Sequence, residues 1–158
     1  MAPETDSNSA VLAIFERFKE ALSHCSLWLF QAAELCRQDE SAFYLTHGDA
    51  GGNFFIGNGR NYILDWDEAM YAPLERDAWV MGCYDWARQL FNDTLKAYHI
   101  PYKLQPERLA FYCYYMYFFY LSEFLTVHSI SDKSQNIAEY FENGWIKDRI
   151  KFADTIFI

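Results

Sequence analysis

Apolar residues recur every three or four positions in the first quarter of the chain, which is the spacing of one face of an α-helix. The apolar stripe runs from Val11 to Cys36, and Ser9 just before it is a typical helix N-cap. We predict one helix of about 28 residues here, with a length of roughly 42 Å. Residues 1–8 are small and polar and include Pro3, so they are predicted to be a disordered lead-in.

Short strand-like runs replace this pattern in the next segment of the chain. They comprise residues 42–46, 54–56 and 62–64. Between the last two runs, Gly57-Asn58-Gly59 supplies residues that tolerate a positive φ, as a tight β-turn requires. The pattern therefore predicts a hairpin formed by the second and third runs.

Helical spacing returns at Glu75 and continues through the rest of the sequence. It predicts four elements: a helix from Glu75 that ends before Pro101, a helix that begins after Pro106 and runs towards His128, a shorter helix from Ser131 to near Gly144, and a terminal amphipathic stretch from Trp145. The sequence shows no internal repeat or linker. We therefore expect one mainly helical domain with a small β-hairpin.

Composition and charge narrow the classes of function. The chain has 158 residues, which is long enough for one domain with a substantial core. Its 22 acidic and 13 basic side chains give a formal net charge of −9, which argues against nucleic acid or an anionic membrane as a partner. The most apolar stretch, residues 109–125, is interrupted by Ser122 and Glu123 and is too polar to span a bilayer.

The cysteines indicate a reducing compartment. They lie at positions 25, 36, 83 and 113 and lack the spacing of a zinc site. The sequence also shows no secretory leader, in which an apolar run follows a charged start. We therefore expect reduced thiols in the core of a cytoplasmic protein.

Polar residues gather where the strand-like runs end. Asp49 and Asn53 follow the first run, and Asp65 follows the third. If these ends meet at one edge of a small sheet, two carboxylates and an amide offer hard oxygen ligands to a divalent metal. A carboxylate that is not bound to the metal can accept a proton from a hydroxyl nucleophile. Phosphoryl transfer needs little more from a protein than this base, correct positioning and charge neutralisation.

The motif His47-Gly48-Asp49 is followed by Asn53, by the hairpin, by Ile63-Leu64-Asp65-Trp66-Asp67 and by the segment 72–77, Ala-Pro-Leu-Glu-Arg-Asp. In this order the residues resemble the aminoglycoside phosphotransferase-type small-molecule kinases, which share the protein-kinase-like fold. The resemblance implies that residues 9–158 form the carboxy-terminal lobe of that α+β fold, mainly α with a small hairpin.

The same resemblance implies a role for each polar residue. Asp49 would be the catalytic base for the substrate hydroxyl, and Asn53 and Asp65 would bind Mg²⁺. His47 would brace the catalytic loop, and Asp77 would hydrogen-bond to the backbone of that loop. One departure from the family is that three residues, rather than the usual four, separate Asp49 from Asn53.

Several other residues have two interpretations. Asp67 and Glu68 are candidates for contact with the substrate or for a place beside the metal, and Asp67 is equally well explained as a surface acid. Eight acidic and two basic side chains lie between Asp39 and Asp77, a balance that would steer Mg²⁺ or a cationic substrate to this region. One predicted helix carries tyrosines that could form a stacking platform, although such a stripe more often packs in a core: Tyr112, Tyr114, Tyr115, Tyr117 and Tyr120.

The family's ATP site lies between this half and an amino-terminal lobe with a phosphate-covering loop and a lysine paired with a glutamate. No glycine-rich turn precedes Ser41, and Lys19, the only lysine before it, falls inside the first predicted helix. The expected activity is Mg²⁺-dependent transfer of the γ-phosphate of ATP to a hydroxyl of a small cationic molecule, such as an aminoglycoside or amino-sugar. A second chain, or a second copy, is expected on the surface that the missing lobe would cover.

Three rival hypotheses remain open at this point. The lobe could be a non-catalytic remnant that serves as an interaction or regulatory module, or it could be one half of a split kinase. A metal-dependent hydrolase that uses Asp49 and Asp65 is the other alternative, although the sequence offers no further His or carboxylate ligand at a suitable spacing.

Overall fold

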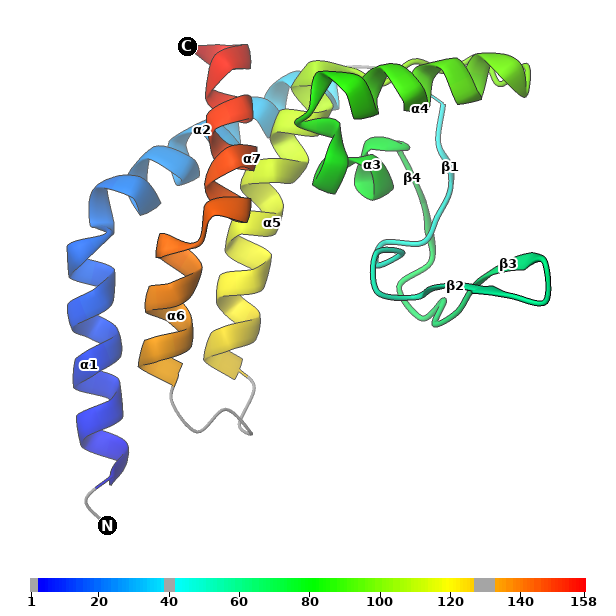
Figure 1. Cartoon of the computed structure of the whole chain (residues 1–158). Helices are drawn as coiled ribbons and strands as arrows, with labels where there is room; N and C mark the ends of the chain where they lie inside the picture. Colours follow the sequence, from blue (N-terminus) through cyan, green and yellow to red (C-terminus); the bar gives the residue numbers. More distant parts are fainter. Residues whose placement is uncertain (1–2, 39–41, 127–132) are drawn as a thin grey trace.

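The computed structural model of the chain describes residues 3–38, 42–126 and 133–158 (Figure 1). Its helices are α1 (Pro3–Arg17), α2 (Lys19–Arg37), α3 (Glu75–Gly82), α4 (Asp85–Ala97), α5 (Pro106–Thr126), α6 (Lys133–Glu142) and α7 (Gly144–Phe157). Its strands are β1 (Tyr44–Thr46), β2 (Phe54–Gly57), β3 (Arg60–Ile63) and β4 (Met70–Ala72). The expected ends of two helices, at His128 and Ser131, lie outside the described residues.

The first predicted helix is present but bent. At Phe18 the backbone leaves helical geometry (φ −105°, ψ 14°), although the amide of Phe18 still donates to Ile14 O and the amide of Leu22 donates to Phe18 O, each at 3.0 Å. The bend lets α1 pack on α6 while α2 packs on α5, and the Phe18 ring stacks on Phe141 of α6 with ring centroids 4.5 Å apart. Figure 1 shows α2 leaving α1 at an angle.

The start of this helix also differs from the prediction. It begins at Pro3 instead of after Ser9, so the backbone of residues 3–8 is helical and Ser9 is not its N-cap. Proline suits the first turn of a helix because the N–H that it lacks has no partner there in any case. Residues 1–2 of the expected lead-in lie outside the described part of the chain.

The predicted hairpin is confirmed. Strands β2 and β3 pair antiparallel with Phe54 opposite Ile63, and the turn residues Asn58 and Gly59 have φ of 51° and 70°. Positive φ at both central turn residues is the geometry that matches the twist of a hairpin. The hairpin projects away from the helices (Figure 1). A second ribbon pairs β1 with β4, with Tyr44 opposite Ala72, and this strand β4 was not predicted.

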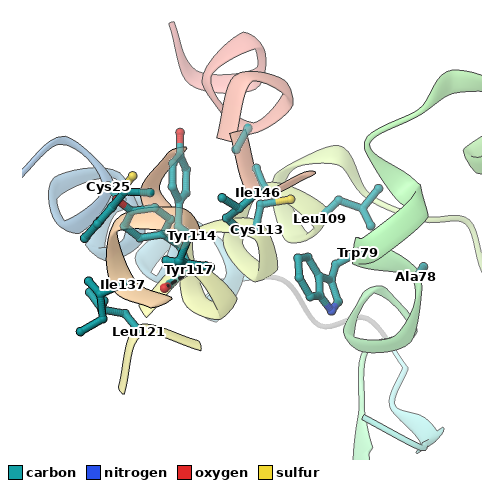
Figure 2. Packing of buried hydrophobic residues seen from close by; sticks show 14 of the residues in the cluster. Cys25, Ala78, Trp79, Leu109, Cys113, Tyr114, Tyr117, Leu121, Ile137 and Ile146 are labelled. Atoms are coloured by element: carbon teal, nitrogen blue, oxygen red, sulfur yellow. Dashed lines mark hydrogen bonds between the residues drawn. The ribbon is translucent and has the colours of Figure 1, made fainter. Parts of the chain in front are cut away.

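Helix α5 is the centre of the core. It packs against α2, α3, α6 and α7, and Leu109, Cys113 and Tyr114 on it are fully buried. Figure 2 shows the packed side chains extending from Cys25 on α2, across α5, to Trp79 on α3. These contacts fix the position of α3, the helix that follows the second ribbon.

The helix predicted from Glu75 is divided into α3 and α4. A Cβ added at Gly82 would lie 2.7 Å from Leu109 Cδ2, so α3 approaches α5 more closely than a side chain at this position would allow. Tyr84 then adopts extended geometry (φ −96°, ψ 129°), and α4 starts in a new direction. Apolar spacing continues through this break, which is why the sequence pattern does not reveal it.

A buried carboxylate ties α3 to the segment that leads into α5. Glu75 is fully buried and accepts hydrogen bonds from the Tyr102 hydroxyl at 2.5 Å and from the backbone amide of Gln105 at 2.6 Å. Burial and the hydrogen bond to Glu75 raise the pKa of Tyr102, so its hydroxyl remains a donor. Glu75 therefore anchors the first turn of α3 to the segment that precedes α5.

All four cysteines were expected in the core, and the structure buries two of them, Cys25 and Cys113. Burial raises the pKa of Cys25 to about 12 and also raises that of the fully buried Cys113. Cys36 and Cys83 are only half-buried. Within the described ranges, no helix combines the length and apolarity needed to cross a bilayer.

These pKa values predict slow thiol chemistry in the core. At pH 8, Cys25 and Cys113 should react with a disulfide reagent at least about a hundredfold more slowly in the folded chain than in guanidinium chloride, because the thiolate is the reactive form. The reaction is measured by the absorbance of the released thiolate, and the reacted residues are identified by mass spectrometry. Equal rates for all cysteines in the folded and unfolded chain would contradict this packing.

Candidate active site

The loop of residues 47–53 leaves β1 and is held at its start by one carboxylate. Asp77, in the first turn of α3, accepts hydrogen bonds from the backbone amide of His47 (2.8 Å, Oδ2) and from that of Gly48 (2.7 Å, Oδ1). Hydrogen bonds from amides to an ionised carboxylate are among the stronger ones in proteins. Asp77 therefore fixes the direction in which the chain enters the loop.

His47 is buried with both ring nitrogens engaged. Its Nε2 lies 2.7 Å from the carbonyl oxygen of Leu64, and its Nδ1 lies 3.2 Å from the backbone nitrogen of Asp49. A carbonyl only accepts and an amide only donates, so this geometry fits the tautomer in which Nε2 donates and Nδ1 accepts. His47 links the loop to the end of β3 and has no ring nitrogen left for proton transfer.

Gly48 occupies a position that only glycine fits. Its φ is +92°, and a Cβ there would overlap the guanidinium group of Arg76. Arg76 lies beneath the loop and donates to Thr46 Oγ1 at 3.0 Å and to the carbonyl oxygen of Glu68 at 2.9 Å. The Glu68 carboxylate, which is largely exposed, lies 3.7 Å from the same guanidinium, so Glu68 is paired with Arg76.

Asp49 and Asn53 stand at the two ends of a short turn. The Asn53 side-chain amide donates to the backbone oxygen of Asp49 at 2.8 Å and lies 3.4 Å from Asp49 Oδ2. The backbone amide of Asn53 donates to Ala50 O at 3.3 Å. The Asp49 side chain is exposed, and the amide oxygen of Asn53 is the atom that this arrangement leaves to ligate a cation.

Asp65 lies beside this turn because the backbone hydrogen bonding between the two hairpin strands extends one residue beyond the last strand pair. The amide of Leu64 donates to Asn53 O at 3.0 Å, which brings Asn53 next to the residue that precedes Asp65. Asp65 itself has a left-handed φ of 61°. The three-residue spacing between Asp49 and Asn53 therefore still places Asn53 beside the chain that carries Asp65.

The carboxylates of Asp49, Asp65 and Asp67 interact electrostatically. A hydrogen bond with Asp67 and the negative charges of Asp67 and Asp49 raise the pKa of Asp65, while the same hydrogen bond lowers the pKa of Asp67. Like charges held this close favour a bound cation, and the oxygen donors of Asp65 and Asn53 fit Mg²⁺. Among the described residues, no set of three His, Cys, Asp or Glu side chains would hold a metal on its own. A magnesium ion here would take its other ligands from water and phosphate oxygens, as it does in kinases.

The pocket beside the loop measures about 520 Å³, a volume that suits a small molecule. Asp49 and the glycines that follow it form one side, and Trp79, Tyr120 and Trp145 form another. The sequence pattern indicates Tyr120 only as one of five tyrosines in a predicted helix, and it indicates neither tryptophan as a site residue. These rings come from α3, α5 and α7, and no local motif indicates that they meet.

The profile of the APH phosphotransferase enzyme family matches residues 4–112 of the sequence. The chain belongs to this family. The match includes the loop of residues 47–53, Asp65 and Asp77, and the resemblance drawn from the motifs is thereby confirmed. Among curated protein sequences, none matches the chain.

The fold of this APH-family chain is also seen in the crystal structure of spectinomycin phosphotransferase, APH(9)-Ia, in complex with ADP and spectinomycin. The two superpose with a TM-score of 0.62 at 19% sequence identity, over 92% of this chain and 49% of that protein. The chain therefore spans about half the length of that phosphotransferase. The expected fold class, a mainly helical carboxy-terminal lobe of the protein-kinase-like fold with a small hairpin, is confirmed.

Proposed function

We propose that this chain is the catalytic lobe of a phosphotransferase that moves the γ-phosphate of ATP, with Mg²⁺, to a hydroxyl of a small cationic molecule. The observation behind the proposal is the bracing of the loop: Asp77 binds two of its amides, and His47 joins it to the end of β3. This bracing leaves Asp49 exposed at a pocket and close enough to Asp65 to raise the pKa of that residue.

In this function, Asp49 accepts the proton of the substrate hydroxyl as the oxygen attacks the phosphate. Asp65 and Asn53 hold Mg²⁺, which when bound neutralises charge on the phosphate oxygens. His47 and Asp77 act only through the loop, because neither has a free polar atom directed to the reacting groups. Asp67 acts through its hydrogen bond to Asp65, and Glu68 acts through Arg76.

The surface of the hairpin supports a nucleotide-binding body as the partner of this lobe. Both faces of β2 and β3 carry exposed apolar side chains, among them Phe55 (52% exposed), Ile56 (77%) and Tyr62 (43%). An isolated two-stranded hairpin is marginally stable in water, and a contiguous apolar patch usually marks a contact surface. We propose that the nucleotide lobe, on this or another chain, covers the hairpin, and a second copy of this lobe is the alternative occupant.

The metal site is tested with Mn²⁺, a paramagnetic substitute for Mg²⁺. Adding Mn²⁺ to the chain should broaden the backbone amide NMR signals of Asn53 and Asp65 selectively. In Asp65→Asn the same broadening should require at least about tenfold more Mn²⁺, because the exposed carboxylate ligand is lost. The matched control is Asp93→Asn, which alters an exposed acid on α4 that pairs with Gln89 and should leave the titration unchanged.

Broadening that is unchanged in Asp65→Asn, or that centres on another part of the chain, would contradict the metal assignment. A non-catalytic remnant that retains Asn53 and Asp65 would bind Mn²⁺ in the same way. The titration therefore tests the metal site, and an assay of phosphoryl transfer separates the proposed enzyme from the remnant hypothesis.

A further inference from the structure

The pocket beside Asp49 has an aromatic wall, which we define as Trp79, Tyr120 and Trp145. The ring centroids lie 6.3 Å apart for Trp79 and Tyr120, 6.2 Å for Trp79 and Trp145, and 5.6 Å for Tyr120 and Trp145. Because each ring contacts the other two, they form one continuous surface. Trp79 is almost fully buried and forms the back of the wall, while Tyr120 and Trp145 are half-buried. Figure 2 shows the indole of Trp79 between α3 and α5.

The aromatic wall is fixed by the surrounding helices. The guanidinium of Arg149 lies 5.7 Å from the centre of the Trp145 ring and donates to the backbone oxygens of Trp145 and Val80. Tyr120 and Trp145 meet edge to face, at an angle of 90°. The rings are therefore held in place before any ligand binds, so binding costs little side-chain conformational entropy.

The charges around the pocket limit how many positive charges a ligand can carry. Among the described residues that line it, the carboxylates are Asp49 and Asp77, and both oxygens of Asp77 already accept backbone amides. Arg76 also lines the pocket, and Arg149 lies behind Trp145. Asp49 is thus the carboxylate that remains for a ligand, so the pocket matches one positive charge and disfavours a polyamine.

Tyr120 connects the aromatic wall to the proposed base. Burial and the nearby negative charge of Asp49 both raise the pKa of Tyr120, so its hydroxyl stays neutral. Asp49 and Tyr120 line the same pocket, so a ligand whose hydroxyl reaches Asp49 can place its adjoining carbon and nitrogen atoms against Tyr120. Aromatic rings beside a carboxylate are the usual recognition surface for alkylated ammonium groups, whose charge is spread over apolar carbon.

We propose that this pocket selects an amino alcohol with a single alkylated ammonium group, which lies against Tyr120 and Trp145 while its hydroxyl meets Asp49. This proposal rests on the proposed function and narrows its substrate class: a polyamine aminoglycoside would be a poor ligand. The aromatic wall attracts the cation and its alkyl groups, and Asp49 orients the hydroxyl.

Binding is measured by calorimetry on the unsubstituted chain without nucleotide, with three probes. These are hydroxyethyl-trimethylammonium, its uncharged tert-butyl analogue, and a polyamine aminoglycoside. We expect the trimethylammonium probe to bind about tenfold more tightly than the uncharged analogue, because only the charged probe gains cation–π attraction. Equal or tighter binding of either other probe would overturn the proposal.

Three variants separate the aromatic face from simple packing. Tyr120→Leu should weaken binding of the trimethylammonium probe about tenfold, whereas Tyr120→Phe should retain it, because phenylalanine keeps the ring and the fold. Trp86→Leu is the control, since Trp86 is exposed on α4 and does not line this pocket. Similar losses in Tyr120→Leu and Tyr120→Phe, or none in either, would overturn the role of the wall.

The proposed function and this inference fail in distinguishable ways. If the trimethylammonium probe binds with the expected preference but no protein containing this lobe transfers phosphate, the phosphotransferase proposal fails and the ligand class stands. If phosphate is transferred but the uncharged or polyamine probe is the better acceptor, the function stands and the ligand class is wrong.

Discussion

Replacing Asp49 with asparagine is expected to lower the rate of phosphoryl transfer by about 10²–10⁴ while leaving the free energy of unfolding nearly unchanged. Asparagine has the same size but does not accept a proton at neutral pH. Asp49 is exposed, and its closest hydrogen bonds use backbone atoms, which the substitution preserves. The rate is measured as kcat with saturating ATP and Mg²⁺ in the protein purified with the proposed nucleotide lobe, whether on this or another chain, and stability is measured by urea unfolding.

The control for this variant is again Asp93→Asn, which removes one negative charge from the surface of α4 far from the loop in sequence. It should change neither kcat nor stability, because isolated surface substitutions usually have small effects. An Asp49→Asn protein that keeps more than about a tenth of the activity would contradict the assignment of Asp49 as the base.

Replacing Asp77 with alanine is expected to lower both stability and activity. The substitution removes the acceptor of two backbone amides, those of His47 and Gly48, at the entry to the loop. Unpaired donors of this kind cost about 1–3 kcal/mol each, so for the two amides we expect a loss of about 2–6 kcal/mol in the free energy of unfolding. Transfer should fall as well, because the loop that carries Asp49 loses its attachment to α3.

Asp77→Asn is expected to have a smaller effect than Asp77→Ala. Its side chain keeps one oxygen acceptor, so it should lie between the wild type and Asp77→Ala in thermal stability. The two substitutions also separate positioning from chemistry: the loss of activity should follow the loss of stability across them, which is not expected for Asp49→Asn. An Asp77→Ala protein with wild-type stability would show that the loop does not depend on this carboxylate.

The sequence pattern was enough to predict the elements that depend on neighbouring residues in the chain. The hairpin was predictable because Asn58 and Gly59 tolerate positive φ, and the helix before Pro101 was predictable from apolar spacing. The bend at Phe18 and the break between α3 and α4 were not, because the apolar stripe runs through both and only packing on α5 and α6 requires them. Strand β4 was missed because it has three residues and pairs with a strand far away in sequence.

The same distinction applies to the site. Asp49, Asn53 and Asp65 were predictable as a group because they follow strand-like runs and match a family motif, and the structure places them together. The pairing of Glu68 with Arg76 was not predictable, since it depends on how the loop lies over Arg76. The aromatic wall was not predictable either, because its three rings come from three helices and meet only in the folded chain.

The most direct test of the proposed function is an assay of phosphoryl transfer on the protein that contains this lobe. The protein is purified under native conditions from its source cells, with any chain that it binds, and incubated with ATP that carries a radioactive γ-phosphate. Hydroxyl compounds are then offered with and without Mg²⁺, and the products are separated and identified by mass spectrometry. We expect a labelled phosphomonoester that forms only with Mg²⁺ and disappears in Asp49→Asn. Label that stays in ATP and inorganic phosphate with every acceptor, or transfer that Asp49→Asn does not change, would contradict the proposed function.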